Sequence, residues 1–298
     1  MNEARRDIEF RSHGTVCRAW FYEPSGTGTR PCVVMAHGLG GTRDAGLEPY
    51  ARRFQEAGYF VLLFDYRHFG ASDGEPRQLL SVSRQLDDWA AAIACAREQP
   101  RVDAAKIALW GSSFSGGHVI VAAARDGRIA AVSAQGPMMD GRAAVLNLLR
   151  YAGVASVLRL SSVALRDQIG AWFGRPPVNV PLVGAPGTLA AMTSSDAESG
   201  YRAITPPDWR NEMSARLALY LGLYRPITSA KHLRCPTLIC VCTKDSVAPA
   251  AAAIALADKL GAQAELRRYD IGHFEIYVGD GFERSCGDQL AFFHRTLG

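Results

Sequence analysis

"KIALWGSSFSGGHVIVAAA", residues 106–124, joins an apolar run to a helix-like run through a turn made almost wholly of serine and glycine. The apolar run predicts a buried strand, and the pattern after residue 113 predicts a helix. A strand, a sharp turn and a helix are the setting of the nucleophile motif G-x-S-x-G, which here reads Gly111-Ser112-Ser113-Phe114-Ser115. Ser113 is therefore the candidate nucleophile. The alternative is a helix N-terminus capped by serine side chains.

The small residues around Ser113 have a physical reason. The positions two before and two after the nucleophile face neighbouring backbone, where a large side chain would clash. Gly111 satisfies this requirement, and Ser115 replaces the second glycine with a residue that is nearly as small. The pair Gly116–Gly117 would let the helix lie close to the strand. Ser112 and Ser115 are accordingly predicted to be turn and packing residues.

Strand-like and helix-like segments alternate on both sides of this stretch. "DIEFRS" and "TVCRAWFYEP" predict an opening antiparallel pair. Further strands are predicted at "CVVMAHG", "YFVLLFDY", "IAAVSAQG", "TLICVCT" and "AELRRYD". Helices are predicted at 44–57, 82–99, 113–125, 249–260 and 283–296. Strands that are apolar throughout and separated by helices indicate an α/β fold with a mostly parallel sheet covered by helices on both faces.

The alternation stops between residues 138 and 230. This block shows no convincing strand and two apolar helical stretches, at 142–173 and 209–222, with the Pro/Gly-rich "RPPVNVPLVGAPG" between them. Since the strand–helix alternation resumes at 237, we interpret residues 138–230 as an insertion into one domain formed by 1–137 and 231–298.

A serine nucleophile needs a base to take its proton and an acid to orient that base. His273 in "YDIGHFEIY" follows the last predicted strand, and Asp245 in "CTKDSVAP" follows the strand before it. Both loops are expected at the same sheet edge as Ser113. The alternatives are a surface histidine and a helix-capping aspartate. Asp270 is a second, less favoured candidate for the acid.

The motif also needs backbone N–H donors for the developing oxyanion. Phe114, directly after the nucleophile, is one expected donor. Leu39, in the glycine-rich "MAHGLGG" of residues 35–41, is the other. His37 is expected to orient this loop by hydrogen bonding, and Gly38 to support it.

Five motifs occur together in one order: "HGLGG", "FDYRHFGASDGEP", "WGSSFSGGH", "TKDSVAP" and "GHFEIY". In this the chain resembles the α/β-hydrolase superfamily over almost its whole length, with dienelactone-hydrolase-like and X-prolyl-peptidase-like esterases as the nearest groups. The resemblance implies an α/β-hydrolase fold, a triad of Ser113, Asp245 and His273, and a helical cap formed by 138–230. It also places His68 near the site, as a candidate substrate contact.

Composition excludes several other classes. The net charge is +4, and the basic residues form no run of the kind that binds nucleic acid. Arg150 and Arg159 interrupt the longest apolar stretch, so we expect no membrane span. The N-terminus has no apolar signal region, and the seven cysteines form no metal or disulfide pattern, which predicts reduced thiols in the cytoplasm. Neither a metal motif nor a nucleotide-binding glycine motif occurs, so neither a metal nor an organic cofactor is expected.

These observations predict a serine hydrolase that cleaves a small-molecule carboxylic ester or thioester, with an apolar acyl or aryl group, through an acyl-enzyme. The alternatives are an acyltransferase on the same triad, a C–C bond hydrolase and a non-catalytic interaction protein of the same fold. A homodimer through the cap or an edge strand stays open.

Overall fold

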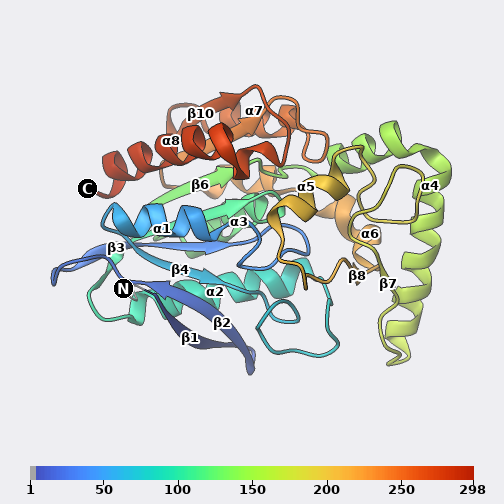
Figure 1. Ribbon diagram of the computed structural model, residues 1–298, viewed down its shortest axis with the longest axis horizontal. Helices are drawn as coiled ribbons and strands as arrows, with labels where there is room; N and C mark the ends of the chain where they lie inside the picture. The colour runs from blue at the N-terminus through green and yellow to red at the C-terminus, as the bar shows by residue number, and fades with distance from the viewer. Residues whose placement is uncertain (1–4) are drawn as a thin grey trace.

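The structure is a computed structural model that describes residues 5–298. Its centre is one eight-stranded sheet with the strand order β1-β2-β4-β3-β5-β6-β9-β10 (Figure 1). The strands are β1 (Arg5–Ser12), β2 (Thr15–Tyr22), β3 (Arg30–Ala36), β4 (Phe60–Phe64), β5 (Val102–Ser112), β6 (Ala131–Gln135), β9 (Thr237–Cys242) and β10 (Ala264–Tyr269). β2 pairs antiparallel with β1 and with β4, and every other pair in this sheet is parallel. The predicted α/β fold is confirmed.

Helices cover both faces of the sheet. The helices on one face are α2 (Val82–Glu98), α3 (Phe114–Asp126) and α7 (Ala250–Leu260), and those on the other are α1 (Glu48–Glu56) and α8 (Gly279–Leu297). The central strands are apolar throughout because alternate side chains enter different cores. In β3, Val34 packs with the α2/α3/α7 side, whereas Val33 packs with the α1/α8 side.

The segment between β6 and β9 forms a cap at one end of the sheet (Figure 1). Its elements are α4 (Gly141–Trp172), β7 (Asn179–Val180), α5 (Ala197–Ile204), β8 (Met213–Ser214), α6 (Leu217–Tyr220) and the 3₁₀ turns η1 (Leu221–Leu223) and η2 (Pro226–His232). Two further 3₁₀ turns, η3 (Gly261–Gln263) and η4 (Glu275–Tyr277), lie in the core.

The cap differs in detail from the sequence prediction. The helix predicted at 142–173 is present as α4, although Gly153, with φ 77° and ψ 165°, breaks it into two parts. The prediction of a helix at 209–222 was wrong for its first half, because helical structure begins only at Leu217. Ser214 lies there in the short strand β8, opposite Asn179 of β7. Its backbone N–H donates to the carbonyl of Gln78 and its hydroxyl accepts from the N–H of Leu80, so it makes long-range bonds in place of helical ones. The helix α5 and the two-stranded pairing of β7 with β8 were not predicted.

α4 is the longest helix of the cap. Among the described residues it is the one helix that is long and apolar enough, by length and composition, to cross a membrane, and 11% of its apolar window is buried. Its inner side packs into the cap through Leu160 and Ala164, which are both buried.

The cysteines are free thiols, and all but Cys95 are buried. Burial raises the pKa of every one of them. The thiols are therefore packing residues rather than reactive groups.

Candidate active site

The candidate nucleophile lies on a strained turn between β5 and α3. Ser113 has φ 57° and ψ −119°, a conformation that side-chain-bearing residues rarely adopt. The turn is possible because its neighbours are small. A Cβ on Gly111 would lie 2.3 Å from the carbonyl oxygen of Ser115, and one on Gly117 would lie 2.5 Å from the carbonyl oxygen of Met138.

The neighbouring serines have partners of their own. The Ser112 hydroxyl is 2.6 Å from the Tyr277 hydroxyl. The Ser115 hydroxyl is 2.8 Å from that of Tyr66, which also accepts a hydrogen bond from the Trp89 indole at 2.8 Å. A serine can therefore replace the second glycine of the motif, because its buried hydroxyl is satisfied.

The structure brings Ser113, His273 and Asp245 together at the carboxyl ends of β5, β10 and β9. The Nε2 atom of His273 is 3.0 Å from the Ser113 hydroxyl, and its Nδ1 atom is 2.6 Å from Asp245 Oδ2. These contacts have the geometry that a Ser-His-Asp triad requires. All three side chains are almost completely buried.

Asp245 also caps its own loop. Its second oxygen, Oδ1, accepts hydrogen bonds from the N–H groups of Val247 at 2.8 Å and Ala248 at 2.6 Å. The capping alternative and the acid are thus two roles of one carboxylate. The rival Asp270 lies away from His273, paired with Lys244 at 2.9 Å, and its side chain is 79% exposed.

A second carboxylate reaches the site from the cap. Asp196, at the start of α5, accepts hydrogen bonds from Ser246 at 2.5 Å and Ser194 at 2.8 Å, and so contacts the loop that holds Asp245. Burial disfavours the charged form of His273, but the attraction of Asp245, with a further contribution from Asp196, outweighs it and raises the pKa of His273. Sequence reasoning missed Asp196, because it lies far along the chain from Ser246 and in no motif.

The glycine loop after β3 lies directly against the nucleophile. A Cβ on Gly38 would be 2.9 Å from the Cβ of Ser113, so only glycine allows this approach. Within residues 5–298 the N–H groups of Leu39 and Phe114 have no hydrogen-bond partner, as expected of donors that await an oxyanion. His37 holds the loop by donating from Nδ1 to the Gly38 carbonyl at 3.0 Å, and burial lowers the pKa of His37 to about 4.

The cap holds the same loop from the other side. The Tyr201 hydroxyl donates to the carbonyl of Leu39 at 2.6 Å, and the Trp209 indole donates to that of Gly40 at 2.9 Å. The rings of Tyr201 and Trp209 stack with centroids 5.2 Å apart. The carbonyls of Leu39 and Gly40 are thus both hydrogen-bonded to side chains of the cap.

The structure does not bring His68, the candidate substrate contact, to the cavity beside Ser113. His68 is buried, with its Nε2 atom 3.1 Å from a guanidinium nitrogen of Arg84 in α2. The loop turns it away because its backbone bonds locally: the His68 N–H donates to Asp73, and its carbonyl accepts from Gln78. His68 is not among the residues that line the cavity at Ser113.

An apolar cavity of about 150 Å³ opens beside Ser113, under the cap. Its walls include Leu39 and Phe114 from the core, Leu148 and Leu160 from α4, and Leu217 from α6. No acidic or basic side chain lines it within the described chain. A buried ester with an apolar acyl group would fit this chemistry.

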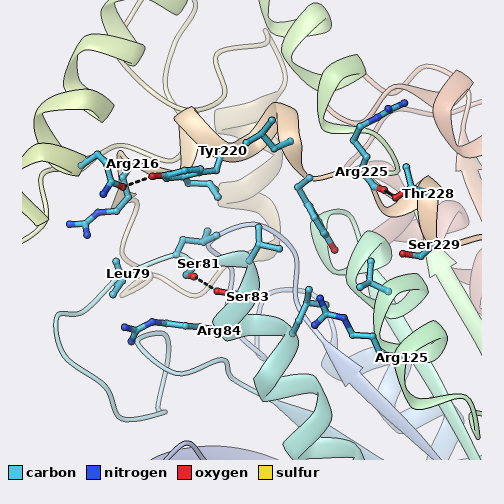
Figure 2. A pocket seen from close by; sticks show the side chains of 18 residues that line it. Leu79, Ser81, Ser83, Arg84, Arg125, Arg216, Tyr220, Arg225, Thr228 and Ser229 are labelled. Carbon is cyan, nitrogen blue, oxygen red and sulfur yellow. Dashed lines mark hydrogen bonds between the residues drawn. The ribbon is translucent and has the colours of Figure 1, made fainter. Parts of the chain in front are cut away.

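A larger groove, of about 670 Å³, lies on the other side of Leu217 (Figure 2). Its lining mixes apolar side chains with arginines, among them Arg84 and Arg125, and it includes neither Ser113 nor His273. The larger hollow is therefore separate from the triad. In residues 5–298 no three His, Cys, Asp or Glu side chains cluster so that they could hold a metal ion.

The fold and this constellation define an α/β hydrolase. The chain belongs to the serine aminopeptidase S33 family, whose pattern matches residues 27–278. It is 43% identical over 297 residues to the quorum-quenching protein AidA of Acinetobacter baumannii, covering 99% of this chain and 96% of that protein. It is 25% identical over 280 residues to the thiohydrolase aneE of Aspergillus aculeatus, covering 91% and 87%. The solved structure of the α/β hydrolase GrgF from Penicillium superposes with a TM-score of 0.83, at 28% identity and with 98% and 99% of the two chains covered.

Proposed function

We propose that this α/β hydrolase cleaves a carboxylic ester or thioester with an apolar acyl or aryl group, through an acyl-enzyme on Ser113. The observation that carries the proposal is the line of hydrogen bonds from Ser113 through His273 to Asp245, which opens onto an apolar cavity. A peptide substrate with a free amino group is less suited, because no carboxylate lines that cavity in the described residues.

Each step has an assigned group. The Ser113 oxygen attacks the carbonyl carbon while His273 Nε2 takes the hydroxyl proton. The N–H groups of Leu39 and Phe114 bind the oxyanion. His273 then gives the proton to the departing alcohol or thiol, and the acyl group stays on Ser113. Water, deprotonated by His273, attacks the acyl carbon, and His273 returns the proton to the departing Ser113 oxygen, which releases the carboxylic acid and restores the enzyme.

The raised pKa of His273 suits this cycle. The imidazolium that forms in the first step is stabilised by Asp245 at 2.6 Å, and the Asp196 carboxylate adds to the attraction. A base that binds the proton well takes it readily from the serine and still releases it to the leaving group.

Labelling with a fluorophosphonate, followed by peptide mapping, tests the assignment. We expect one adduct, on Ser113, and we expect Ser113→Ala to lower kcat by about 10⁵ or more, by analogy with the subtilisin triad. Ser112→Ala is the matched control and should keep most of the activity. An adduct on Ser112 or Ser115 would contradict the assignment.

Acyl transfer is a second candidate, favoured by the likeness to a protein named polyketide transferase grgF, which is 34% identical over 186 residues. An alcohol or amine would then replace water on the same acyl-enzyme. Product analysis with a competing alcohol distinguishes the two, because a transferase forms the new ester in preference to the free acid.

A further inference from the structure

The outer side of α4 carries an unusual concentration of exposed apolar side chains. Every exposed large apolar side chain in the described residues except Val278 lies in the cap. Those on the second half of α4 are Val154, Leu158, Leu165, Ile169 and Trp172, and Phe173 follows directly. Trp172 is 71% exposed and Phe173 75%. Patches of this kind on a soluble domain mark interaction sites.

The spacing shows that these residues form one surface. Val154, Leu158, Leu165, Ile169 and Trp172 follow each other by three, four or seven positions, so they lie along one side of the helix. We call this side the α4 outer face. The opposite side of α4 provides Leu148 and Leu160 to the apolar cavity. Figure 1 shows α4 as the element furthest from the sheet at the cap end, so the outer face is open.

Arginines accompany this face, and acids do not. The exposed arginines of residues 141–175 are Arg142, Arg150, Arg159, Arg166 and Arg175, and within the described chain none of them forms an ion pair. Asp167 is the one acid in that stretch, and it is buried and paired with Arg216 at 2.8 Å. Arg159 and Arg166 each follow a residue of the outer face by one position, so they flank it.

We propose that the α4 outer face docks on a membrane surface that contains anionic phospholipid. An apolar helix face flanked by arginine, with tryptophan beside it, has the composition of a helix that lies in the plane of a membrane interface. The helix lies on the membrane rather than across it, because Gly153 breaks it, Arg159 and Arg166 interrupt it, and Leu160 and Ala164 hold it to the cap.

Charge favours a lipid surface over a second copy of the chain. In a symmetric dimer the same face would meet itself. Arg159 and Arg166 of both copies would then be brought together with no acid on that face to pair with them, which is unfavourable. Anionic headgroups supply the missing charge. Arg159 and Arg166 are seven positions apart in the sequence and lie on one side of the helix only because it is folded. The sequence therefore shows no basic run.

Sedimentation with vesicles tests the proposal. We expect the protein to bind vesicles of phosphatidylcholine mixed with phosphatidylglycerol, and to bind phosphatidylcholine alone much more weakly. The double variant Arg159→Gln/Arg166→Gln should lose roughly thirtyfold in partitioning, which corresponds to ~1 kcal/mol for each arginine. The matched control is Arg128→Gln/Arg268→Gln, two exposed arginines of the core, which should bind as the parent does.

Tryptophan fluorescence locates the contact. The other four tryptophans are buried or partly buried, so a blue shift on adding anionic vesicles should come from Trp172 and disappear in Trp172→Phe, which still binds. Ser113→Ala should bind vesicles normally, so a failure of the proposed catalysis and a failure of docking are distinguishable.

Three results would overturn the proposal. The first is equal binding to neutral and anionic vesicles, or to neither. The second is unchanged binding by Arg159→Gln/Arg166→Gln. The third is a blue shift of Trp172 that follows protein concentration without vesicles, together with dimerisation in sedimentation velocity, because the occupant would then be a second copy.

Discussion

Asp245 binds His273 through one carboxylate oxygen and caps its own loop through the other. A substitution can separate these two roles. In Asp245→Asn the amide oxygen can still accept from the N–H groups of Val247 and Ala248, so the loop is kept. The amide can no longer stabilise the imidazolium and favours the wrong tautomer of His273. We expect kcat to fall by about 10⁴, as it does when the triad aspartate of a serine protease is replaced by asparagine. Steady-state kinetics on a soluble ester measures the loss.

Asp270→Asn is the control for that variant. Asp270 is exposed and paired with Lys244, so its loss should leave kcat within a fewfold of the parent. If Asp270→Asn were the more damaging change, Asp245 would not be the acid.

Asp196 gives a second prediction at the residue scale. Its negative charge helps to raise the pKa of His273, and His273 must be neutral to act as the base. Asp196→Asn removes that charge, so the pKa of His273 should fall and the acid limb of the kcat/KM profile should move to lower pH. A pH series of kcat/KM measures the shift.

The exposed Asp208 of the cap serves as the control. Asp208→Asn should leave the acid limb where it is. A loss of kcat/KM in Asp196→Asn with no movement of the limb would mean that Asp196 acts only as a support for Ser246.

At the scale of elements, the core could be predicted and the cap only in part. The strands of the core were predictable because both faces of each strand are buried, which leaves continuous apolar runs. The helix α5 was not, since it contains Gly200 in its interior, a weak helix former. The structure gives the reason for this glycine: a Cβ there would lie 2.1 Å from the Phe274 ring.

In the candidate site, too, the residues from the core could be predicted from the sequence and those from the cap could not. Ser113, His273 and Asp245 could be found because each follows a predictable strand at one sheet edge. Tyr201 and Trp209 could not, because their partners are backbone carbonyls of the glycine loop, and no sequence pattern reports such long-range contacts. His68 lies in a recognisable motif, yet local hydrogen bonds turn it away.

The inner side of α4 should set the acyl length. For the parent we expect kcat/KM to rise from acetate to butyrate or hexanoate esters by up to about fourfold for each methylene that is buried in the transition state. Leu148→Trp would fill part of the cavity of about 150 Å³ and should remove the gain for the longer esters while acetate is still cleaved. The measurement is kcat/KM over a series of p-nitrophenyl esters.

Leu146→Trp is the matched control, since Leu146 lies on the same helix and is 56% exposed. It should leave the length series unchanged. A parent enzyme that prefers acetylated sugars over apolar esters would contradict the assignment of the cavity to the acyl chain.

For the whole molecule, the cap is part of the catalytic architecture rather than a cover alone. Tyr201 and Trp209 tie it to the glycine loop, and Asp196 ties it to the loop of Asp245 through Ser246. Asn147 of α4 adds a bond to the Ser246 carbonyl at 2.7 Å. A movement of the cap would therefore change the oxyanion donors and the acid together.

We expect that breaking a buried ion pair remote from the site would destabilise the whole fold. The guanidinium of Arg67, after β4, donates to Asp88 of α2 at 2.6 Å and to Ser12 of β1 at 2.7 Å, and so joins three elements. Asp88 is fully buried, and Arg67 is 5% exposed. Asp88→Ala would leave the Arg67 charge buried without a partner, so we expect the free energy of unfolding to fall by roughly 3–5 kcal/mol. Urea denaturation followed by tryptophan fluorescence measures the change.

The comparison is Glu198→Ala, which breaks the exposed pair with Arg202 and should cost no more than about 0.5 kcal/mol. Similar losses in the two variants would show that the Arg67–Asp88 pair does not hold the N-terminal strands to the core.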